Sequence, residues 1–266
     1  MKIVFKFFKY LIIVVVVATA FNSCNKDEEE YNTVKLLKTI IHVSDDKQFK
    51  FDQYKFEYDE QHRITKISEY FFDGDLYNTT SFTYERDNLI QVLQSFSSGS
   101  NEMYEYTKNG NTITQKYTYN GNGSFTTIHT IELNSDGLPV QQEREEEEIG
   151  NSNITIFEYQ DGNLTKKTQI YTSIVYDYTE YYTNTYYYDD KKGALYYCKT
   201  PKWYLIMYLN DLGVKNNITE GGHRFRPWTV YAYKYDNADF PAERTRKFFG
   251  QMYEGESDVV FTYIKK

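Results

Sequence analysis

Most of the chain after residue 50 alternates apolar or aromatic residues with polar ones. The clearest group is a set of tyrosines at even positions: Tyr176, Tyr178, Tyr182, Tyr186 and Tyr188. Side chains two residues apart point to the same side of a strand, so these rings would share one face. Three further segments predict strands by their β-branched and aromatic residues, namely Val34 to Val43, Trp203 to Leu209 and Val259 to Ile264.

A short pattern repeats along this region. An aromatic residue, any residue and a tyrosine precede a polar turn, after which a leucine or isoleucine follows. Seven copies, some degenerate, begin at Phe56, Phe82, Tyr104, Ile131, Phe157, Tyr186 and Tyr233. Their turns contain Asn, Asp and Gly, which tolerate the positive φ of tight reversals, as in Asn134-Ser135-Asp136-Gly137. Each copy therefore predicts a β-hairpin.

The repeat predicts an all-β fold in the form of a single antiparallel up-and-down meander. Two strands per copy and the three further segments give roughly 14 to 17 strands. Open sheets seldom exceed about ten strands without curling, splitting or closing. We therefore expect a strongly curled sheet or a closed barrel, because closure removes the unpaired edges.

The first 23 residues have the pattern of a secretory signal peptide. Lys2, Lys6 and Lys9 precede an apolar run from Leu11 to Ala18. The uncharged stretch is shorter than the roughly 20 residues that cross a bilayer, so cleavage is expected. The end of this segment, Phe21-Asn22-Ser23-Cys24, resembles a bacterial lipobox. That resemblance implies acylation of Cys24, and two or more acyl chains anchor a protein stably in a membrane.

Residues 24–33 are expected to form a tether, and residues 34–266 the repeat-built domain. The tether begins Asn25-Lys26-Asp27-Glu28-Glu29-Glu30 and has no apolar residue to pack in this stretch. This pattern resembles the surface-export signal of Bacteroidota-type lipoproteins, which implies an outer-membrane protein that faces outward. An anchor facing the periplasm is the alternative, since an acidic spacer also serves solubility alone.

The repeats also resemble known families. Phe56-Glu57-Tyr58-Asp59 and Tyr233-Lys234-Tyr235-Asp236 are similar to the Tyr-Asp repeats of Rhs-type surface proteins. Together with the lipobox, the tether, the Asn-rich Val214 to Ile218 and the final Phe261 to Ile264, they resemble a Bacteroidota lipoprotein family of unknown function. The resemblance covers nearly the whole mature chain and implies a porin-like fold, but it brings no activity.

Composition narrows the class of protein. The chain of 266 residues has 29 Tyr, 18 Phe and a formal net charge of −8. Such aromatic content predicts a folded domain, and the acidity opposes nucleic acid as a partner. The mean hydropathy is −0.69, and both faces of most strands carry polar residues. An integral membrane barrel needs an uninterrupted apolar band, so we expect a soluble, lipid-tethered barrel.

Motifs for catalysis are missing from the sequence. His42, His62, His129 and His223 stand singly, without the spacing of a zinc site. The sequence has no G-x-S-x-G, G-x-G-x-x-G or P-loop motif. A pair of carboxylates of the glycosidase type can still arise by folding. We expect no cofactor, no metal and no enzyme activity.

Several residues are candidates for ligand binding. The segment from His223 to Trp228 is the densest cationic and aromatic cluster. Arg224 and Arg226 can hold a carboxylate or sulfate, and Trp228 can stack on a sugar. The plainer interpretation is a loop that pairs with neighbouring acids. The other candidates are Trp203, Tyr178 and Tyr182.

Two functional hypotheses follow from these patterns. The first is a noncatalytic surface lipoprotein that binds a glycan or a host or surface macromolecule through aromatic-rich strands and loops. The second is a carrier of lipid or another apolar molecule in the curled sheet, and a purely structural role at the surface is the third possibility. The expected partners are the outer-membrane lipid, reached through acylated Cys24, and the bound glycan or protein.

Overall fold

The computed structural model describes residues 33–43, 51–121, 123–145, 151–173, 176–223, 228–249 and 254–266. The predicted signal peptide, Cys24, nearly all of the tether, Arg224 and Arg226 lie outside the described residues. The chain divides into two units, Leu36–Ile264 and the terminal segments Met1–Lys35 with Lys265–Lys266. In the terminal unit, the backbone N–H of Lys266 donates to the Val34 carbonyl. The lumen and the side chains that line it belong to the unit Leu36–Ile264.

The described residues form sixteen strands. They are β1 (Lys35–His42), β2 (Phe51–Tyr58), β3 (Ile64–Phe71), β4 (Leu76–Glu85), β5 (Asn88–Phe96), β6 (Asn101–Asn109), β7 (Thr112–Asn120), β8 (Phe125–Leu133), β9 (Pro139–Glu145), β10 (Asn151–Gln160), β11 (Asn163–Ser173), β12 (Tyr178–Tyr188), β13 (Ile218–His223), β14 (Trp228–Tyr235), β15 (Pro241–Phe249) and β16 (Glu254–Lys265).

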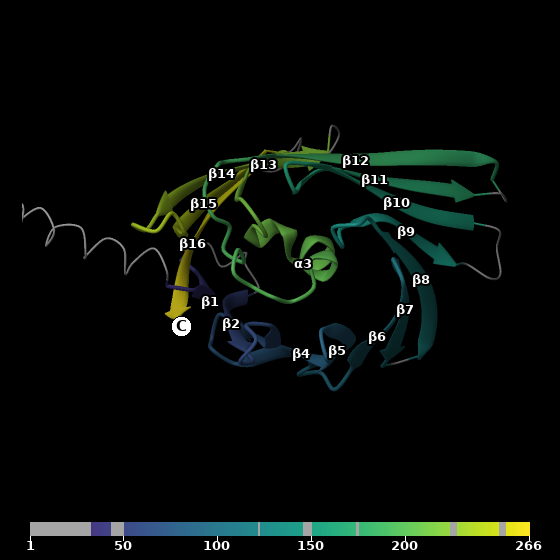
Figure 1. Cartoon of the computed structure of the whole chain (residues 1–266), viewed down its shortest axis with the longest axis horizontal. Coiled ribbons are helices and arrows are strands. Elements are labelled where there is room, and N and C mark those ends of the chain that lie inside the picture. The colour runs from purple at the N-terminus through teal and green to yellow at the C-terminus, as the bar shows by residue number, and fades with distance from the viewer. Residues whose placement is uncertain are drawn as a thin grey trace, which may run out of the picture. The chain divides into compact units, whose positions relative to one another are not determined.

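These strands close into one antiparallel barrel in chain order, with β1 beside β16 (Figure 1). A hydrogen bond from the Val43 N–H to the Asp258 carbonyl, 3.0 Å long, contributes to this closure. The predicted up-and-down meander and its strand number are thereby confirmed, and of the two expected forms, a curled sheet or a closed barrel, the structure has the closed barrel. Closure leaves no sheet edge along the wall, which explains how so many strands form one sheet.

Six of the seven predicted hairpins are confirmed, and an Asx side chain organises several of their turns. The copy that begins at Tyr186 is followed instead by the long connection from β12 to β13. Asp59 accepts from the N–H groups of Gln61 and Arg63 at 2.9 Å each. Asn134 and Asp236 make the same pair of bonds to the residues two and four positions later. The aspartates and asparagines thus replace the backbone hydrogen bonds that each reversal interrupts.

In six of the seven copies, the third position of the repeat, where tyrosine is usual, coincides with a β-bulge. The pairing register shifts directly before Tyr58, Tyr84, Leu133, Tyr159, Tyr188 and Tyr235. Near the bulges, tyrosine hydroxyls donate to the backbone carbonyl of a residue at or near the start of the preceding strand. These bonds are Tyr84 to Ile64, Tyr159 to Pro139, Tyr188 to Leu164, Tyr233 to Ile218 and Tyr263 to Pro241, at 2.6–2.9 Å. In four of the seven copies, a tyrosine of the repeat thus ties its strand to the preceding strand.

The prediction of a strand from Trp203 to Leu209 is wrong. This segment is the helix α3 (Lys202–Leu209), followed by a 3-10 turn, η1 (Asn210–Leu212). It lies inside the ring of strands (Figure 1), where its side chains pack against the inner wall. A segment in the lumen has no neighbouring strand, and only a helix satisfies its backbone groups internally. The wall covers it on several sides, so an apolar sequence without a polar face is favourable there.

The long connection between β12 and β13 carries α3 into the lumen and back. Before the helix, the Lys199 N–H donates to the His62 carbonyl, and Thr200 Oγ1 accepts from the Ile64 N–H at 2.8 Å. The incoming and returning chains pair where Leu195 donates to the Gly213 carbonyl. They approach so closely at Gly193 that an added Cβ would lie 2.2 Å from the Gly213 oxygen. The connection is thus held to the wall and to itself.

Inward and outward positions of the wall differ in character. Inward side chains such as Phe56, Phe82 and Val92 form one apolar cluster with Tyr204 and Leu205 of α3. On the outer face, five ion pairs join neighbouring strands: Lys66–Glu57, Lys116–Glu105, Lys166–Glu158, Lys234–Glu243 and Lys247–Glu256. The apolar core of this barrel is therefore its interior.

Candidate functional site

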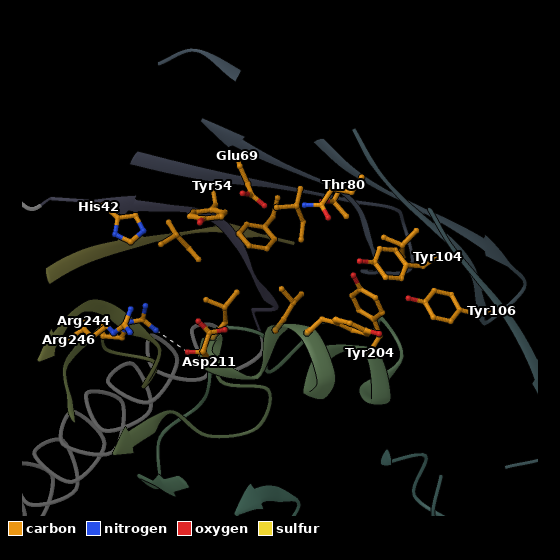
Figure 2. A pocket seen from close by; sticks show the side chains of 18 residues that line it. His42, Tyr54, Glu69, Thr80, Tyr104, Tyr106, Tyr204, Asp211, Arg244 and Arg246 are labelled. Atoms are coloured by element: carbon orange, nitrogen blue, oxygen red, sulfur yellow. Dashed lines mark hydrogen bonds between the residues drawn. The ribbon is translucent and has the colours of Figure 1, made fainter. Parts of the chain in front are cut away.

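A cavity lies inside the barrel, between the wall and α3 with η1, which together are called the plug below. Its volume is about 480 Å³, and its lining comes from β1 to β6, β15 and the plug. Figure 2 shows side chains of both the wall and α3 converging on this space. Alternation along the strands sends Tyr54, Glu69 and Tyr104 inward, since each shares its direction with a core residue on the same strand.

The helix supplies one side of the cavity through Tyr204 and Tyr208, one turn apart. The Tyr204 ring contacts Phe82 edge to face, with ring centroids 5.4 Å apart. The Tyr208 hydroxyl donates a 2.8 Å hydrogen bond to Gln115 Oε1 on β7. Burial raises the pKa of Tyr208 to about 12, so this hydroxyl keeps its proton at neutral pH. The end of α3 is therefore fixed to the wall.

Two carboxylates face this cavity from different elements. Burial raises the pKa of Glu69, although a hydrogen bond with Asn78 opposes the shift. Burial and the charges of Glu69 and Asp211 raise the pKa of Tyr54 to about 12. Tyr54 therefore remains a hydrogen-bond donor between the two acids.

Two arginines of β15 face the same cavity. Arg244 is only 7% exposed, and its Nη1 donates a 2.9 Å hydrogen bond to the backbone carbonyl of Asp211 (Figure 2). Its guanidinium also lies 5.1 Å from the centre of the Tyr231 ring. Arg246 lines the cavity next to it and contacts the Phe248 ring. The cavity thus combines a buried and a half-buried cation with tyrosine rings.

A second cavity, of about 290 Å³, shares Tyr208 and Asp211 with the first. Lys167 points into it from β11, and burial lowers the pKa of this lysine. The Lys167 ammonium lies 5.8 Å from the centre of the Phe157 ring. The end of α3 and η1 therefore divide the lumen between two chambers, each with a buried cation.

A polar hollow of about 380 Å³ is lined from β10, β11 and β12. Two of the predicted site residues, Tyr178 and Tyr182, come together here with Glu180 between them. The Tyr182 hydroxyl donates to the Glu180 carboxylate. Polar neighbours from the adjacent strands include Gln169 and Asn153.

The two predicted tryptophans lie elsewhere. Trp203 is 5% exposed, and its ring packs against Tyr106 at 5.0 Å, so it is part of the core and has no open face. Trp228 lies on the outer face of β14, where its indole N–H donates to Glu220. Its ring also approaches Tyr187. The predicted residues that the structure describes do not form one site.

The cavity residues were missed by the sequence analysis, although a signal for them exists. Glu69 is two residues after the core residue Ile67, and Arg244, Arg246 and Phe248 share one parity on β15. A charged residue in phase with inward apolar residues indicates a polar group that points into the lumen. Phase alone does not show that β3 and β15 face the same space, because that depends on closure.

Other kinds of site find no support in the part of the chain that the structure describes. There, no three His, Cys, Asp or Glu side chains lie together in a way that could hold a metal ion. Among the same residues, no helix has the length and apolar content to cross a membrane.

Comparison with known proteins supports the fold of this chain but gives no information on its activity. No protein-family profile matches the chain, and no curated protein matches it. Among solved structures, the chain is similar to a porin-like protein from Bacteroides uniformis ATCC 8492. The TM-score is 0.54 and the sequence identity is 15%, over 88% of this chain and 100% of that chain. The porin-like fold implied by the resemblance is confirmed.

Proposed function

We propose that this protein is a noncatalytic lipoprotein of the outer membrane, anchored through acylated Cys24, that binds a glycan in the lumen of its barrel. The observation that carries the proposal is the cavity of about 480 Å³ beside α3, lined by tyrosine rings and polar groups. Small-molecule sites typically measure 300–1,000 Å³ and combine apolar walls with a few placed polar groups. A saccharide unit has this size and needs both kinds of contact.

The chemistry of the lining supports a sugar. Tyrosine offers a ring face for the C–H groups of a sugar and a hydroxyl for its oxygens. Tyr54, Tyr104 and Tyr204 contribute such rings, and Gln94 and Thr80 add amide and hydroxyl groups. Because several elements hold these side chains, the cavity is formed before a ligand arrives, which lowers the entropy that binding costs.

The outer face supports anchoring by lipid instead of insertion of the wall. The five ion pairs between neighbouring strands lie on this face, and their side chains are 41–78% exposed. A membrane barrel presents an apolar band there, and a charge at mid-bilayer costs about 2–4 kcal/mol. The pattern favours a water-facing wall, with lipid on Cys24 as the attachment.

An apolar carrier is the alternative, favoured by Ile40, Ile67, Val92, Leu209 and Leu212 in the same lining. The charged groups of the cavity argue against it. A hydrocarbon ligand would take water from Glu69, Asp211 and Arg246 and return no hydrogen bond, which is costly. A sugar replaces those lost hydrogen bonds.

The test is a glycan array probed with residues 25–266, which lack the signal peptide and Cys24. We expect retention of at least one glycan class, and loss of that retention in Gln94→Trp, because the indole would fill the cavity. Ser95→Trp is the matched control. It is the next residue of β5 and points outward.

No retention of any glycan by a folded sample would contradict the proposal. Mass spectrometry of the purified protein addresses the alternative. Copurified lipid that Gln94→Trp excludes would favour the apolar carrier, whereas its absence with glycan retention supports the sugar.

A further inference from the structure

Arg244 and Arg246 are adjacent inward residues of β15. Residues two apart on a strand lie about 6.6–6.8 Å from each other on one face. Figure 2 shows both guanidinium groups together at one end of the cavity, near Asp211, with Tyr104 and Tyr106 toward the other end. Both arginines line this cavity.

These two cations are short of acceptors. The Nε atoms of both Arg244 and Arg246 are buried and have no hydrogen-bond partner among the described residues. None of the ion pairs between described residues includes either arginine. The contact of Arg244 with Asp211 is to the backbone carbonyl, which carries no full charge.

A guanidinium whose buried Nε–H has no acceptor is unfavourable, because the removed water must be replaced by other hydrogen bonds. Both arginines line a cavity that is large enough for a ligand, so their guanidinium groups can meet an anion there. The two arginines therefore provide hydrogen-bond donors for a ligand that brings the acceptors.

We infer that Arg244 and Arg246 form an anion-binding subsite that takes the carboxylate of an acidic sugar, such as a uronic acid. The inference rests on the proposed function and names its substrate class. A guanidinium presents a planar fork of donors that matches the two oxygens of a carboxylate. The tyrosines at the other end would hold the ring of the sugar.

The neighbouring acids favour a carboxylate over a phosphate. Glu69 and Asp211 line the same cavity, so its two cations are accompanied by two carboxyl groups. A ligand with a single negative charge meets less repulsion from these acids than one with two. The charge balance therefore selects a monoanion.

The experiment follows the arginine Nε–H resonances by NMR in protein labelled with ¹⁵N-arginine. Acetate, galacturonate and neutral galactose are the probes, and Arg246→Gln is the test variant. Lys247→Gln is the control, since it removes one positive charge from the outer face of the same strand. Arg246→Lys keeps the charge without the fork, and thermal unfolding verifies that each variant folds.

We expect acetate and galacturonate to shift the Nε–H resonances of both arginines, and galactose to leave them in place. Arg246→Gln should weaken galacturonate binding about tenfold or more, because a charge-assisted hydrogen bond is lost. Arg246→Lys should lie between this variant and the wild type, and Lys247→Gln should match the wild type.

The inference is overturned if neither carboxylate moves these resonances, if galactose moves them equally, or if Arg246→Gln titrates like the wild type. The glycan array separates this result from the proposed function. If wild type and Arg246→Gln retain glycans equally, the arginine subsite is contradicted and the proposal of a sugar site in the lumen stands. If carboxylates shift the resonances but no glycan is retained, the anion subsite stands and glycan binding is contradicted.

Discussion

At the scale of single residues, the hydroxyl group of tyrosine has a structural task in this barrel. Five tyrosines donate to a backbone carbonyl at or near the start of the preceding strand. These carbonyls lie opposite bulges, where the hydrogen-bond ladder is locally disrupted, and a buried carbonyl without a partner is costly. Phenylalanine would fill the same space but would not satisfy the oxygen.

Replacing Tyr159 by phenylalanine tests this role. The Tyr159 hydroxyl donates at 2.6 Å to the Pro139 carbonyl, so Tyr159→Phe should lower the free energy of unfolding by about 1–3 kcal/mol. Denaturant unfolding followed by circular dichroism measures it. Tyr181→Phe, with a ring that is 64% exposed, is the matched control and should change little. Equal effects of the two changes would contradict the role of the bond.

Glu69 makes stability depend on pH. Its pKa is raised in the folded protein, so the folded state holds this proton more tightly than the unfolded state. The stabilising contribution is full below the unfolded pKa, near 4.5, and is lost as pH rises through the folded value. Glu69→Gln does not titrate, so its Tm relative to the wild type should increase from about pH 4 to pH 7. A difference in Tm that stays constant over this range would contradict the prediction.

At the scale of elements, the repeat and the plug differ in how far the sequence predicts them. Hairpins, turns and strand number were predictable because alternation and Asx or Gly turns are local. The helix α3 was not, since the apolar run of seven residues from Trp203 to Leu209 fits a buried strand and a buried helix equally well. What selects the helix is the surrounding wall, which leaves no strand edge to pair with.

The cavity was also predictable from the sequence only in part. The parity of Arg244 and Glu69 is local and indicates their inward direction, but their convergence requires β15 and β3 to face each other across a closed ring. Candidates chosen by local density, such as Trp203 and Trp228, lie in the core and on the outer wall. A high local density of aromatic and cationic residues in the sequence does not show whether a side chain is buried, or on which face of the wall it lies.

The plug and the wall should unfold together. The two tryptophans of the chain report on them separately, with Trp203 on α3 and Trp228 on β14. Single-tryptophan variants Trp203→Phe and Trp228→Phe should give coincident fluorescence transitions, because α3 and the wall share one apolar cluster. Two separate transitions would mean that the plug is an independent element.

Leu205→Ala measures how much the plug contributes. Leu205 is 1% exposed within that cluster, and such a truncation should cost about 2–5 kcal/mol. Leu76→Ala is the matched control on the wall. Leu76 is 48% exposed, and its truncation should cost about 0.5 kcal/mol or less. A small effect of Leu205→Ala would show that the wall is stable without the helix.

At the scale of the whole molecule, the described wall carries charges on its outer face and apolar side chains toward its interior. Apolar side chains pack around α3 in the lumen, and ion pairs between neighbouring strands lie on the outer face. A membrane barrel has the opposite arrangement, an apolar outside and a polar inside. The likeness in fold to a porin-like protein therefore does not carry over to the surface chemistry of the wall.

Cell fractionation with Cys24→Ser tests the anchor. The wild type should remain with the membrane fraction after a high-salt wash, and Cys24→Ser should be released, because the acyl chains are lost. Cys198→Ser keeps Cys24 and is the control that should behave like the wild type. Membrane retention of Cys24→Ser would indicate that another part of the chain holds the bilayer.

The tyrosine bonds at the bulges have a consequence for how barrels of this kind change size. Most repeats bring their own turn and bulge, and four of the seven also bring a tyrosine bond to the preceding strand, so such a hairpin carries the contacts that fix its pairing. Gain or loss of one repeat alters the strand number by two and leaves every other side chain on its original face. Since barrel diameter grows with strand number, tandem duplication can widen the lumen in discrete steps and so adapt one architecture to ligands of different size.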